Sequence, residues 1–341
     1  MRFFITGGAG FMGSNFLRFA LRSYKDIQIL NFDKLTYAGN PENLRDFEDD
    51  LRYKFVQGDI TVKDQVDQYI REFRPDIIVN FAAETHVDRS IMDPAAFLKT
   101  DVFGTHNLLE AARKYNIRMV QVSTDEVYGA VKIGEAAEDA PYVPRSPYSA
   151  SKASADHLCY AYFVTYGTPV VITHSCNFYG PYQYPEKLIP LFITNLLEDK
   201  KVPVYGDGQQ IREWIFTEDY CRALDVIAQK GTPGAIYNIG TGYRVPNLEV
   251  VRKILSALGK DEAQIEYVKD RPGHDRRYAV SHEKLRQEFG WEPKVSFDEG
   301  IAKTVQWYKN NKTWWGPLKS GDFSAYYKSW YTDQLKVNQN T

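Results

Sequence analysis

The sequence is poor in cysteine, has no surplus of charge of either sign and contains no long apolar run. Its 341 residues include only three cysteines, Cys159, Cys176 and Cys221, which are widely spaced and form no CxxC pair. An odd and scattered set argues against a disulfide framework and against a structural zinc site, so we expect no metal. Unpaired thiols favour a reducing compartment, and we therefore expect a cytoplasmic protein.

The charge balance is close to neutral. The chain has 42 Lys and Arg residues and 44 Asp and Glu residues, a net charge of −2 with histidine neutral. Proteins that coat nucleic acid or an anionic membrane need a basic surplus, so we expect neither partner. No apolar stretch reaches the roughly 18 residues of a membrane span, and the N-terminal MRFFITGGAG is too short in its apolar part for a signal peptide. A small anionic ligand is still allowed, because it requires only a local cluster of cations.

The composition that is present is that of a globular protein, with 43% hydrophobic and 25% charged residues. At roughly 100–200 residues per domain, the length suggests two domains. In the first half, short apolar runs alternate with amphipathic stretches. This alternation predicts an α/β fold with a doubly wound parallel sheet. The expected strands are 2–6, 27–33, 53–57, 76–80 and 118–123, and the expected helices are 11–22, 62–73 and 95–115.

The second half has a different texture. A helix from Tyr148 and a strand at 170–175 continue the first pattern, but after Asn177 prolines punctuate shorter segments. Further helices are expected at 218–229, 248–258 and 297–310, and the aromatic stretch from Trp307 to Tyr331 is expected to pack on the body of the protein. The predicted first domain is 1–176 plus about 212–240, with 218–238 returning to it. A smaller mixed α/β domain takes 177–211 plus about 241–335, and 336–341 is a frayed tail.

A glycine-rich turn follows the first predicted strand. Gly7, Gly10 and Gly13 have GxxGxxG spacing and open a helix, where backbone N–H groups and the helix dipole favour a pyrophosphate. Asp33 ends the second strand about 20 residues after the last glycine, where a carboxylate accepts from both hydroxyls of a ribose. The same carboxylate repels a 2′-phosphate. This pattern predicts NAD rather than NADP, with Lys34 weakening the preference only slightly.

Two further strand ends carry weaker signals for the cofactor. Asp59 follows the third strand and either lies near the adenine or caps the helix at 62–73, and the sequence does not separate these interpretations. Ala82 and Ala83 follow the fourth strand. Their small side chains suit either a closely passing cofactor or a helix–sheet contact.

The predicted chemistry lies at two later motifs. Tyr148 and Lys152 are four residues apart on one helix face, and we expect the ammonium, with the positive nicotinamide, to lower the pKa of the phenol. Thr124, Asp125 and Glu126 follow the fifth strand, at the sheet edge where open α/β proteins place their active sites. Two adjacent carboxyls divide acid and base roles when their environments separate their pKa values.

Seven motifs together resemble one family. They are TGGAGFMG, DKLTYAGN, AAETHVDRS, STDEVYG, SPYSASKASADHL, NFYGPYQYPEKLIP and RPGHDRRYA. The sequence resembles the dTDP-glucose 4,6-dehydratases, of the extended short-chain dehydrogenase/reductase family, from residue 1 to about residue 331. The resemblance implies a Rossmann domain that binds NAD and a C-terminal domain that binds a nucleotide sugar, in deoxysugar (for example rhamnose) biosynthesis.

The resemblance also assigns residues. It implies that a tightly held NAD, recycled in each turnover, is bound by Gly7, Gly10, Phe11, Met12, Gly13, Asp33, Lys34, Thr36, Asp59, Ile60, Ala82, Ala83, Thr100, Ser123, Tyr148, Lys152 and Asn177. It implies that the substrate is bound by Thr85, Thr124, Asn177, Glu186, Lys187, Leu188, Pro203, Tyr205, Arg212, Asn247, Arg271 and His274. For Lys187, Arg212 and Arg271 the chemistry agrees, because their side chains offer donors to a diphosphate.

The implied reaction uses Thr124, Asp125, Glu126, Tyr148 and Lys152. Tyr148 takes the C4 hydroxyl proton as hydride leaves C4, with Thr124 holding the oxygen. Glu126 then takes the C5 proton, Asp125 protonates the departing C6 hydroxyl, and hydride returns to C6. Two neighbouring carboxyls that share one proton suit this division of roles.

The sequence departs from the family at two positions, where Asp101 and Phe178 stand in place of asparagines. The family forms homodimers through a pair of helices, which correspond here to about 95–115 and 148–166. Aromatic residues of the second helix are either that interface or core: Tyr160, Tyr162, Phe163 and Tyr166.

The sequence disfavours several other functions. A 4-epimerase or a decarboxylase of the same superfamily has no need of an acid for a C6 hydroxyl, so the Asp125–Glu126 pair disfavours both. Dehydratases of GDP-mannose or UDP-N-acetylglucosamine usually lack an aspartate at the position of Asp125. A non-catalytic NAD-sensing or RNA-binding module predicts loss of the catalytic set and often a basic face, and this chain has neither.

Overall fold

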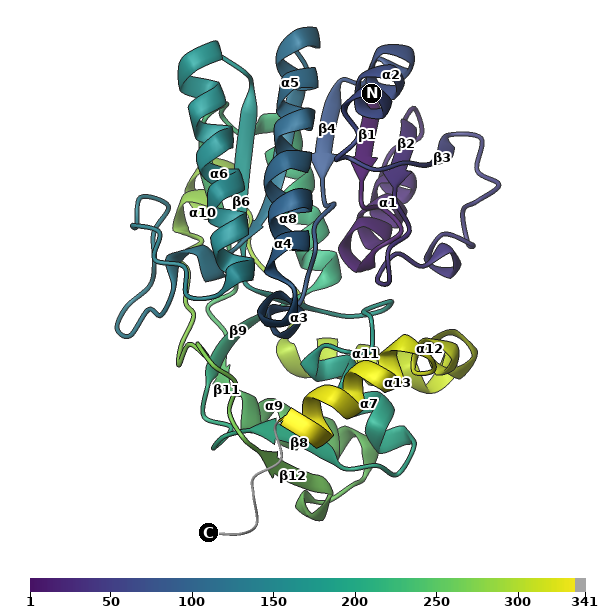
Figure 1. Ribbon diagram of the computed structural model, residues 1–341, viewed down its shortest axis with the longest axis vertical. Helices are drawn as coiled ribbons and strands as arrows, with labels where there is room; N and C mark the ends of the chain where they lie inside the picture. The colour runs from purple at the N-terminus through teal and green to yellow at the C-terminus, as the bar shows by residue number, and fades with distance from the viewer. Residues whose placement is uncertain (335–341) are drawn as a thin grey trace.

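The largest element of the structure, a computed structural model that describes residues 1–334, is a parallel sheet of seven strands. The strand order is β10-β6-β5-β4-β1-β2-β3 (Figure 1). The expected tail at 336–341 lies outside the described residues. The strands are β1 (Arg2–Thr6), β2 (Gln28–Asp33), β3 (Tyr53–Gln57), β4 (Ile77–Asn80), β5 (Arg118–Thr124), β6 (Val170–Ser175) and β10 (Ile236–Ile239).

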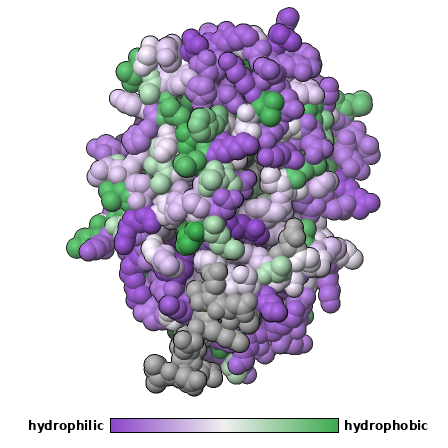
Figure 2. Space-filling view, viewed as in Figure 1, coloured by the Kyte–Doolittle hydropathy of each residue, from purple (hydrophilic) through white to green (hydrophobic). Residues whose placement is uncertain are grey.

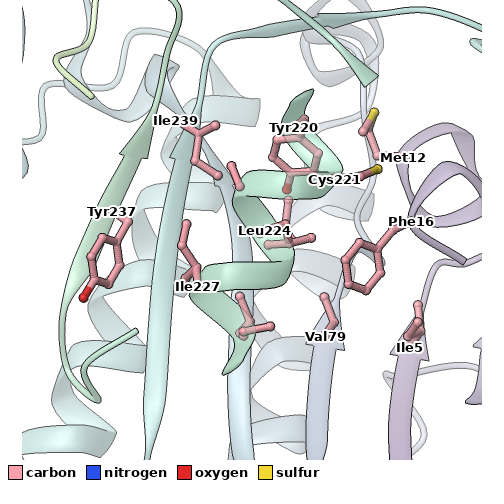
Figure 3. Packing of buried hydrophobic residues seen from close by; sticks show 14 of the residues in the cluster. Ile5, Met12, Phe16, Val79, Tyr220, Cys221, Leu224, Ile227, Tyr237 and Ile239 are labelled. Carbon is pink, nitrogen blue, oxygen red and sulfur yellow. The ribbon is translucent and has the colours of Figure 1, made fainter. Parts of the chain in front are cut away.

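Helices cover both faces of this sheet, because side chains alternate along each strand. Phe3 and Ile5 of β1 pack with α1 (Phe11–Ser23) and α8 (Thr217–Lys230), and Figure 3 shows α8 over the strands beside Phe16. Phe4, between them, belongs to the opposite cluster, with residues of the other helices. Those helices are α2 (Lys63–Phe73), α5 (Thr105–Tyr115) and α6 (Pro147–Tyr166). The predicted doubly wound parallel sheet is confirmed.

The expected helix at 95–115 is wrong in detail, because the chain forms several pieces there. After α3 (Val87–Met92), α4 (Pro94–Phe97) runs into a wider π-helical turn, η2 (Leu98–Gly104), before α5 begins. The turn carries Asp101, whose buried carboxylate accepts from the Ser151 hydroxyl at 2.6 Å and from the Glu84 N–H at 3.0 Å. Widened turns of this kind often occur at functional sites.

The second region is built around smaller sheets and its own hydrophobic cluster. One sheet is mixed, in the order β11-β9-β7, and the other pairs β12 with β8. The strands are β7 (Asn177–Tyr179), β8 (Val202–Tyr205), β9 (Ile211–Phe216), β11 (Arg244–Pro246) and β12 (Ile265–Val268). The helices are α7 (Leu188–Leu197), α9 (Asn247–Leu258), α11 (Phe297–Asn310), α12 (Lys312–Leu318) and α13 (Asp322–Tyr327). By contrast, α10 (Glu283–Phe289) packs against β10 of the large sheet, and its Leu285 belongs to the cluster of that sheet. Short 3₁₀ turns occur along the chain, η1 (Pro41–Asn43) and η3 (Asp125–Tyr128) in the first region and η4 (Glu262–Gln264) in the second. The π-helical segment η5 (Lys328–Gln334) follows α13.

Two long-range predictions about this half are confirmed. Segment 218–238 does return to the large sheet, because α8 covers it and β10 pairs in parallel with β6. The aromatic C-terminal stretch does pack on the body, where Tyr308, Trp315 and Trp330 are almost fully buried. Within residues 1–334, the structure contains no helix with the length and apolarity needed to cross a bilayer.

Candidate active site

The glycine turn between β1 and α1 forms one wall of a cavity of about 330 Å³. Gly7 has a φ of +70°, and a Cβ there would lie 2.6 Å from the Ala82 nitrogen. A Cβ on Gly13 would lie 2.3 Å from the Gly7 oxygen. Only glycine allows this close approach of α1 to the strand ends, which leaves the N-terminus of α1 facing the cavity.

Asp33, at the end of β2, borders the same cavity. Its two carboxylate oxygens accept from the N–H groups of Ala9 and Leu35, each at 2.8 Å, and burial raises its pKa. Each oxygen keeps a further lone pair for a ligand hydroxyl. Asp59 also borders the cavity, forms an ion pair with Lys34 at 2.9 Å and accepts from the Thr61 N–H. It does not cap α2, because the residue preceding that helix is Val62.

These residues fit a dinucleotide. All of the residues that the resemblance assigns to NAD line this one cavity. Asn177 lines the same cavity, and its buried Oδ1 finds no hydrogen-bond partner in the described part of the chain. Buried polar atoms are normally satisfied, so an unpartnered one on a cavity-lining residue agrees with a polar ligand.

The residues with chemistry reach the cavity from β5 and α6. Thr124 ends β5, and its hydroxyl oxygen accepts from the Glu126 N–H at 3.2 Å, which begins the turn η3. A capping box between Ser146 and Ser149 starts α6, so that Tyr148 lies in its first turn. Tyr148, Lys152 and the Thr124–Glu126 tripeptide all line the cavity.

Asp125 and Glu126 have different environments. Asp125 is buried, with 3% of its surface exposed, and its Oδ2 has no partner among residues 1–334. Burial, followed by the charges of Glu126 and Glu213, raises the pKa of Asp125 well above its usual range. This environment favours the protonated form of Asp125, which suits the role of an acid.

The protein groups around Tyr148 oppose its ionisation. Burial, followed by the charges of Glu126 and Asp101, raises the pKa of Tyr148 well above 10, although a side-chain hydrogen bond with Thr124 works to lower it. The Lys152 ammonium donates to the Val122 carbonyl at 2.7 Å. Lys152 lines the cavity. Desolvation of the phenol outweighs the other influences of the protein itself, and the decrease expected from Lys152 together with the positive nicotinamide stays a prediction.

A second cavity, of about 140 Å³, shares residues with the first and extends into the smaller sheets. The residues assigned to the substrate line one cavity or both. Thr85 and Thr124 border the first. Pro203, Tyr205, Arg212, Asn247, Arg271 and His274 border the second, and Asn177, Glu186, Lys187 and Leu188 border both. The cations predicted to face one diphosphate therefore meet at one place.

The charges of the second cavity are held by specific partners. Arg271 forms an ion pair with Asp88 at 2.7 Å, and the Tyr205 hydroxyl donates to the same carboxylate at 2.8 Å. Burial opposes the ionisation of Asp88, but His86 and Arg271, with hydrogen bonds from Arg271 and Tyr205, lower its pKa to about 2. Burial and the charges of Arg271 and Arg212 lower the pKa of His274 to about 3, so His274 contributes a neutral ring.

The two departures from the family pattern have structural explanations. Asp101 is held by Ser151 and Glu84, and burial raises its pKa to about 6 although Lys152 and Ser151 act to lower it. Phe178 lines the cavity and packs against Tyr220, with ring centroids 4.5 Å apart.

The aromatic residues of α6 that were expected to form either an interface or core fall into two groups. Tyr160 and Tyr166 are exposed, whereas Tyr162 and Phe163 pack in the core.

Sequence reasoning missed several residues that line the cavities. Trp214 borders both, and its indole N–H has no partner among the described residues. Asp88 lies in α3, within the motif AAETHVDRS that follows β4, so its place in that motif was an available signal. Tyr331 borders the second cavity and stacks on Tyr205 with ring centroids 5.8 Å apart. No local pattern marks Tyr331, because only folding brings the C-terminal segment to this site.

A dinucleotide cradle, a Tyr–Lys helix and an acidic pair at one sheet edge, next to a cationic second cavity, define an extended short-chain dehydrogenase/reductase that acts on nucleotide sugars. The chain belongs to the nucleotide-sugar 4,6-dehydratases: the family model described as GDP-mannose 4,6 dehydratase matches residues 4–304. The predicted resemblance to dTDP-glucose 4,6-dehydratases is confirmed.

Individual relatives agree. The chain is 47% identical to the dTDP-glucose 4,6-dehydratase of Streptomyces niveus, over 94% of this chain and 97% of that protein. Two solved structures match 94% of this chain and 100% of theirs. The dTDP-glucose 4,6-dehydratase of Bacillus anthracis in complex with NAD has 50% identity and a TM-score of 0.88. That of Streptomyces venezuelae, also with NAD bound, has 48% identity and a TM-score of 0.91.

Proposed function

We propose that this protein converts dTDP-glucose to dTDP-4-keto-6-deoxyglucose and water, as an NAD-dependent hydro-lyase of deoxysugar biosynthesis. The observation that carries the proposal is the pair of carboxyls at the end of β5, in the same cavity as Tyr148 and the glycine turn. Asp125 is buried beside Glu126, and its pKa is raised. A 4-epimerase has no use for this pair.

The roles of the residues follow from their chemistry. When bound, NAD supplies a positive charge and the group that takes a hydride from C4 and returns it to C6 in each turnover. That positive charge would favour the phenolate of Tyr148 against the effect of burial. As the phenolate, Tyr148 removes the C4 hydroxyl proton, and Thr124, hydrogen-bonded to Tyr148, holds the C4 oxygen. Lys152 orients the cofactor. The resulting 4-ketone makes the C5 proton acidic, which prepares the elimination.

Elimination uses the two carboxyls in opposite states. Glu126 takes the C5 proton, and Asp125 protonates the C6 hydroxyl, which leaves as water. Glu126 returns a proton to C5 after C6 is reduced. The proton that Tyr148 takes from the C4 hydroxyl balances the one that Asp125 gives to the leaving water.

The substrate is held across both cavities. Lys187, Arg212 and Arg271 are the donors proposed for the diphosphate, since charge-assisted hydrogen bonds to phosphate are strong. Arg271 offers Nε, a buried donor with no partner in the described part of the chain. Tyr205 and Pro203 are proposed to flank the base. Separate hydrophobic clusters in the two regions support the predicted division into two domains. In this proposal the first domain binds NAD and the second binds the nucleotide sugar.

The test is a product assay. Purified protein given dTDP-glucose and no added reductant is expected to form a 4-keto-6-deoxy sugar, detected by its strong absorbance in alkali. GDP-mannose and UDP-N-acetylglucosamine serve as comparison substrates. Product from either of these, with none from dTDP-glucose, would contradict the assignment of the nucleotide.

A variant tests the assignment of the base. Glu126→Gln is expected to reduce the cofactor with dTDP-glucose but to lose exchange of the C5 proton with solvent. The matched control is Glu135→Gln, an exposed glutamate paired with Arg244, which is expected to behave as the parent enzyme. Retained C5 exchange in Glu126→Gln would assign the base to another residue.

We also propose a homodimer in the cytoplasm. Large apolar side chains are exposed on η2 and α6, where Phe103 is 65%, Val164 62% and Tyr160 56% exposed. Figure 2 shows apolar residues among the polar ones on the face that α5 and α6 present. The double variant Tyr160→Asp, Val164→Asp is expected to be monomeric in sedimentation, and a monomeric parent protein would refute the dimer. The compartment is supported by three free, buried thiols.

A further inference from the structure

Tyr278 contacts the proposed base from outside the cavities. Its hydroxyl lies 3.3 Å from Glu126 Oε2 and 3.0 Å from Asp275 Oδ2, and the side chain is 4% exposed. Neither cavity includes Tyr278 among its lining residues, whereas Glu126 borders both. Tyr278 therefore reaches the reacting atoms only through Glu126. This inference rests on the proposed function.

The neighbours of Tyr278 hold its ring and its hydroxyl in place. Arg212, a proposed diphosphate ligand, lies over the ring at 4.2 Å and donates to the Asp275 carbonyl at 3.0 Å. Arg145 forms an ion pair with the Asp275 carboxylate at 2.8 Å. Tyr278 thus connects the nucleotide-binding arginine to the base. The other charged or titratable groups that act on Glu126 and Tyr278 are Asp125, Tyr148, Lys187 and Arg271.

A phenol carries one proton, so it donates fully to only one of two carboxylates at a time. Burial, with the charge of Glu126, raises the pKa of Tyr278 well above 10, so the hydroxyl stays protonated and remains a donor. The hydrogen bond is strongest toward whichever carboxylate is charged. During the elimination, the charge state of Glu126 changes and that of Asp275, paired with Arg145, does not.

We infer that Tyr278 is a positioning residue whose hydroxyl holds the Glu126 carboxylate ready for the C5 proton and follows its charge. With Glu126 ionised, both carboxylates are charged and the hydroxyl is shared between Glu126 and Asp275, at 3.3 and 3.0 Å. Once Glu126 has taken the C5 proton, the hydroxyl turns to Asp275, and it returns when Glu126 gives the proton back to C5. No proton leaves Tyr278 in this cycle.

Tyr278→Phe tests this role, because it keeps the ring under Arg212 and removes the donor. The measurement is the release of deuterium from C5-labelled dTDP-glucose in a single turnover across pH, together with KM, the absorbance of the reduced cofactor and thermal unfolding. We expect C5 release to fall by about tenfold or more and its acidic limb to move to higher pH. We expect KM and cofactor reduction to change by less than about twofold.

Tyr179→Phe is the matched control, since Tyr179 is also buried and its hydroxyl is 3.5 Å from the Phe297 carbonyl, remote from Glu126 in its contacts. It is expected to leave C5 release unchanged. A Tyr278→Phe profile that superimposes on the parent profile would overturn the inference. So would equal losses in C5 release, KM and stability, which indicate a merely structural role.

A second variant keeps the inference testable if Tyr278→Phe does not fold. Asp275→Asn removes the competing charged acceptor, so the hydroxyl stays with Glu126 and the acidic limb of C5 release is expected to move to lower pH. An unchanged limb would overturn the inference. If the parent enzyme makes no product from dTDP-glucose, the proposed function fails; if it does and only these variants behave as the parent, the inference alone fails.

Discussion

The two cavities of this protein handle charge in opposite ways. In the larger cavity the carboxyls of Asp125 and Glu126 lie next to each other, and burial with mutual repulsion raises the pKa of Asp125. In the smaller cavity Asp88 is equally buried, yet Arg271 and Tyr205 satisfy its charge and its pKa falls to about 2. Burial acts to raise the pKa of both carboxyls, and the neighbouring groups decide whether that rise is reversed.

This difference corresponds to two tasks. A reacting site needs groups that change protonation, so its carboxyls are left without full compensation. A binding site needs charges that persist, so its cations are held by partners before the ligand arrives. The contrast predicts that variants of the larger cavity affect the rate and variants of the smaller one affect substrate affinity and stability.

The largest effect is expected for Tyr148→Phe. Without the hydroxyl, no group is placed to take the C4 proton, so kcat is expected to fall by about 10²- to 10⁴-fold with little change in KM. Steady-state kinetics with dTDP-glucose measure this. Tyr160→Phe, an exposed tyrosine of the same helix, is the control. A loss that appears mainly in KM would place Tyr148 in the binding task instead.

Arg271→Lys is expected to weaken substrate binding in the smaller cavity. A lysine keeps the charge but loses the planar set of donors, so KM for dTDP-glucose is expected to rise by about tenfold or more while kcat changes less. Arg276→Lys is the matched control, because Arg276 lies in the same motif and pairs with Asp207 at the surface. If kcat falls and KM does not change, the division of tasks between the cavities is wrong.

Asp88→Asn is expected to destabilise the fold. The pKa of Asp88 is depressed to about 2, so its charge contributes stability above its unfolded pKa, and this contribution disappears as the pH falls toward 2. Loss of the charge costs about 2 kcal/mol or more at neutral pH, since it also leaves Arg271 unpaired. Thermal unfolding is expected to show a decrease of a few degrees in Tm at pH 7 that shrinks below pH 4. An unchanged Tm at pH 7 would contradict the role of this pair.

The smallest effect on stability, opposite in sign to that of Asp88→Asn, is expected for Asp125→Asn. The raised pKa of Asp125 means that the folded protein binds a proton that the unfolded chain releases above about pH 4, so its stability falls as the pH rises through that range. The amide removes this cost. Thermal unfolding is expected to give a Tm slightly above that of the parent at pH 8 and equal to it near pH 4, although elimination is lost. A lower Tm at pH 8 would show that Asp125 is stabilised as a carboxylate.

Local sequence was sufficient for the larger cavity. Asp33, Thr124, Asp125 and Glu126 follow buried apolar strands, and the carboxyl ends of parallel strands meet at one edge. Tyr148 and Lys152 lie one helical turn apart. These positions follow from short-range periodicity, and the structure brings all of them to one cavity.

Other features were beyond local reasoning. The wider turn around Asp101 depends on bonds to Ser151 and Glu84, which no helical periodicity indicates. The raised pKa of Tyr148 depends on how deeply the phenol is buried, and spacing from Lys152 does not reveal this. The contact between Tyr278 and Glu126 joins residues 152 positions apart.

The sequence by itself determined the parallel sheet, the dinucleotide turn, the acidic pair and the family, because each depends on the order of residues within short segments. The tertiary structure alone decided which charges are compensated. Asp88 and Arg271 are 183 residues apart in the sequence, yet their ion pair keeps Asp88 charged. Asp125 is surrounded by other carboxylates instead, and its pKa is raised. Burial and through-space charge depend on every element that packs around a group, so they exist only once the chain has folded.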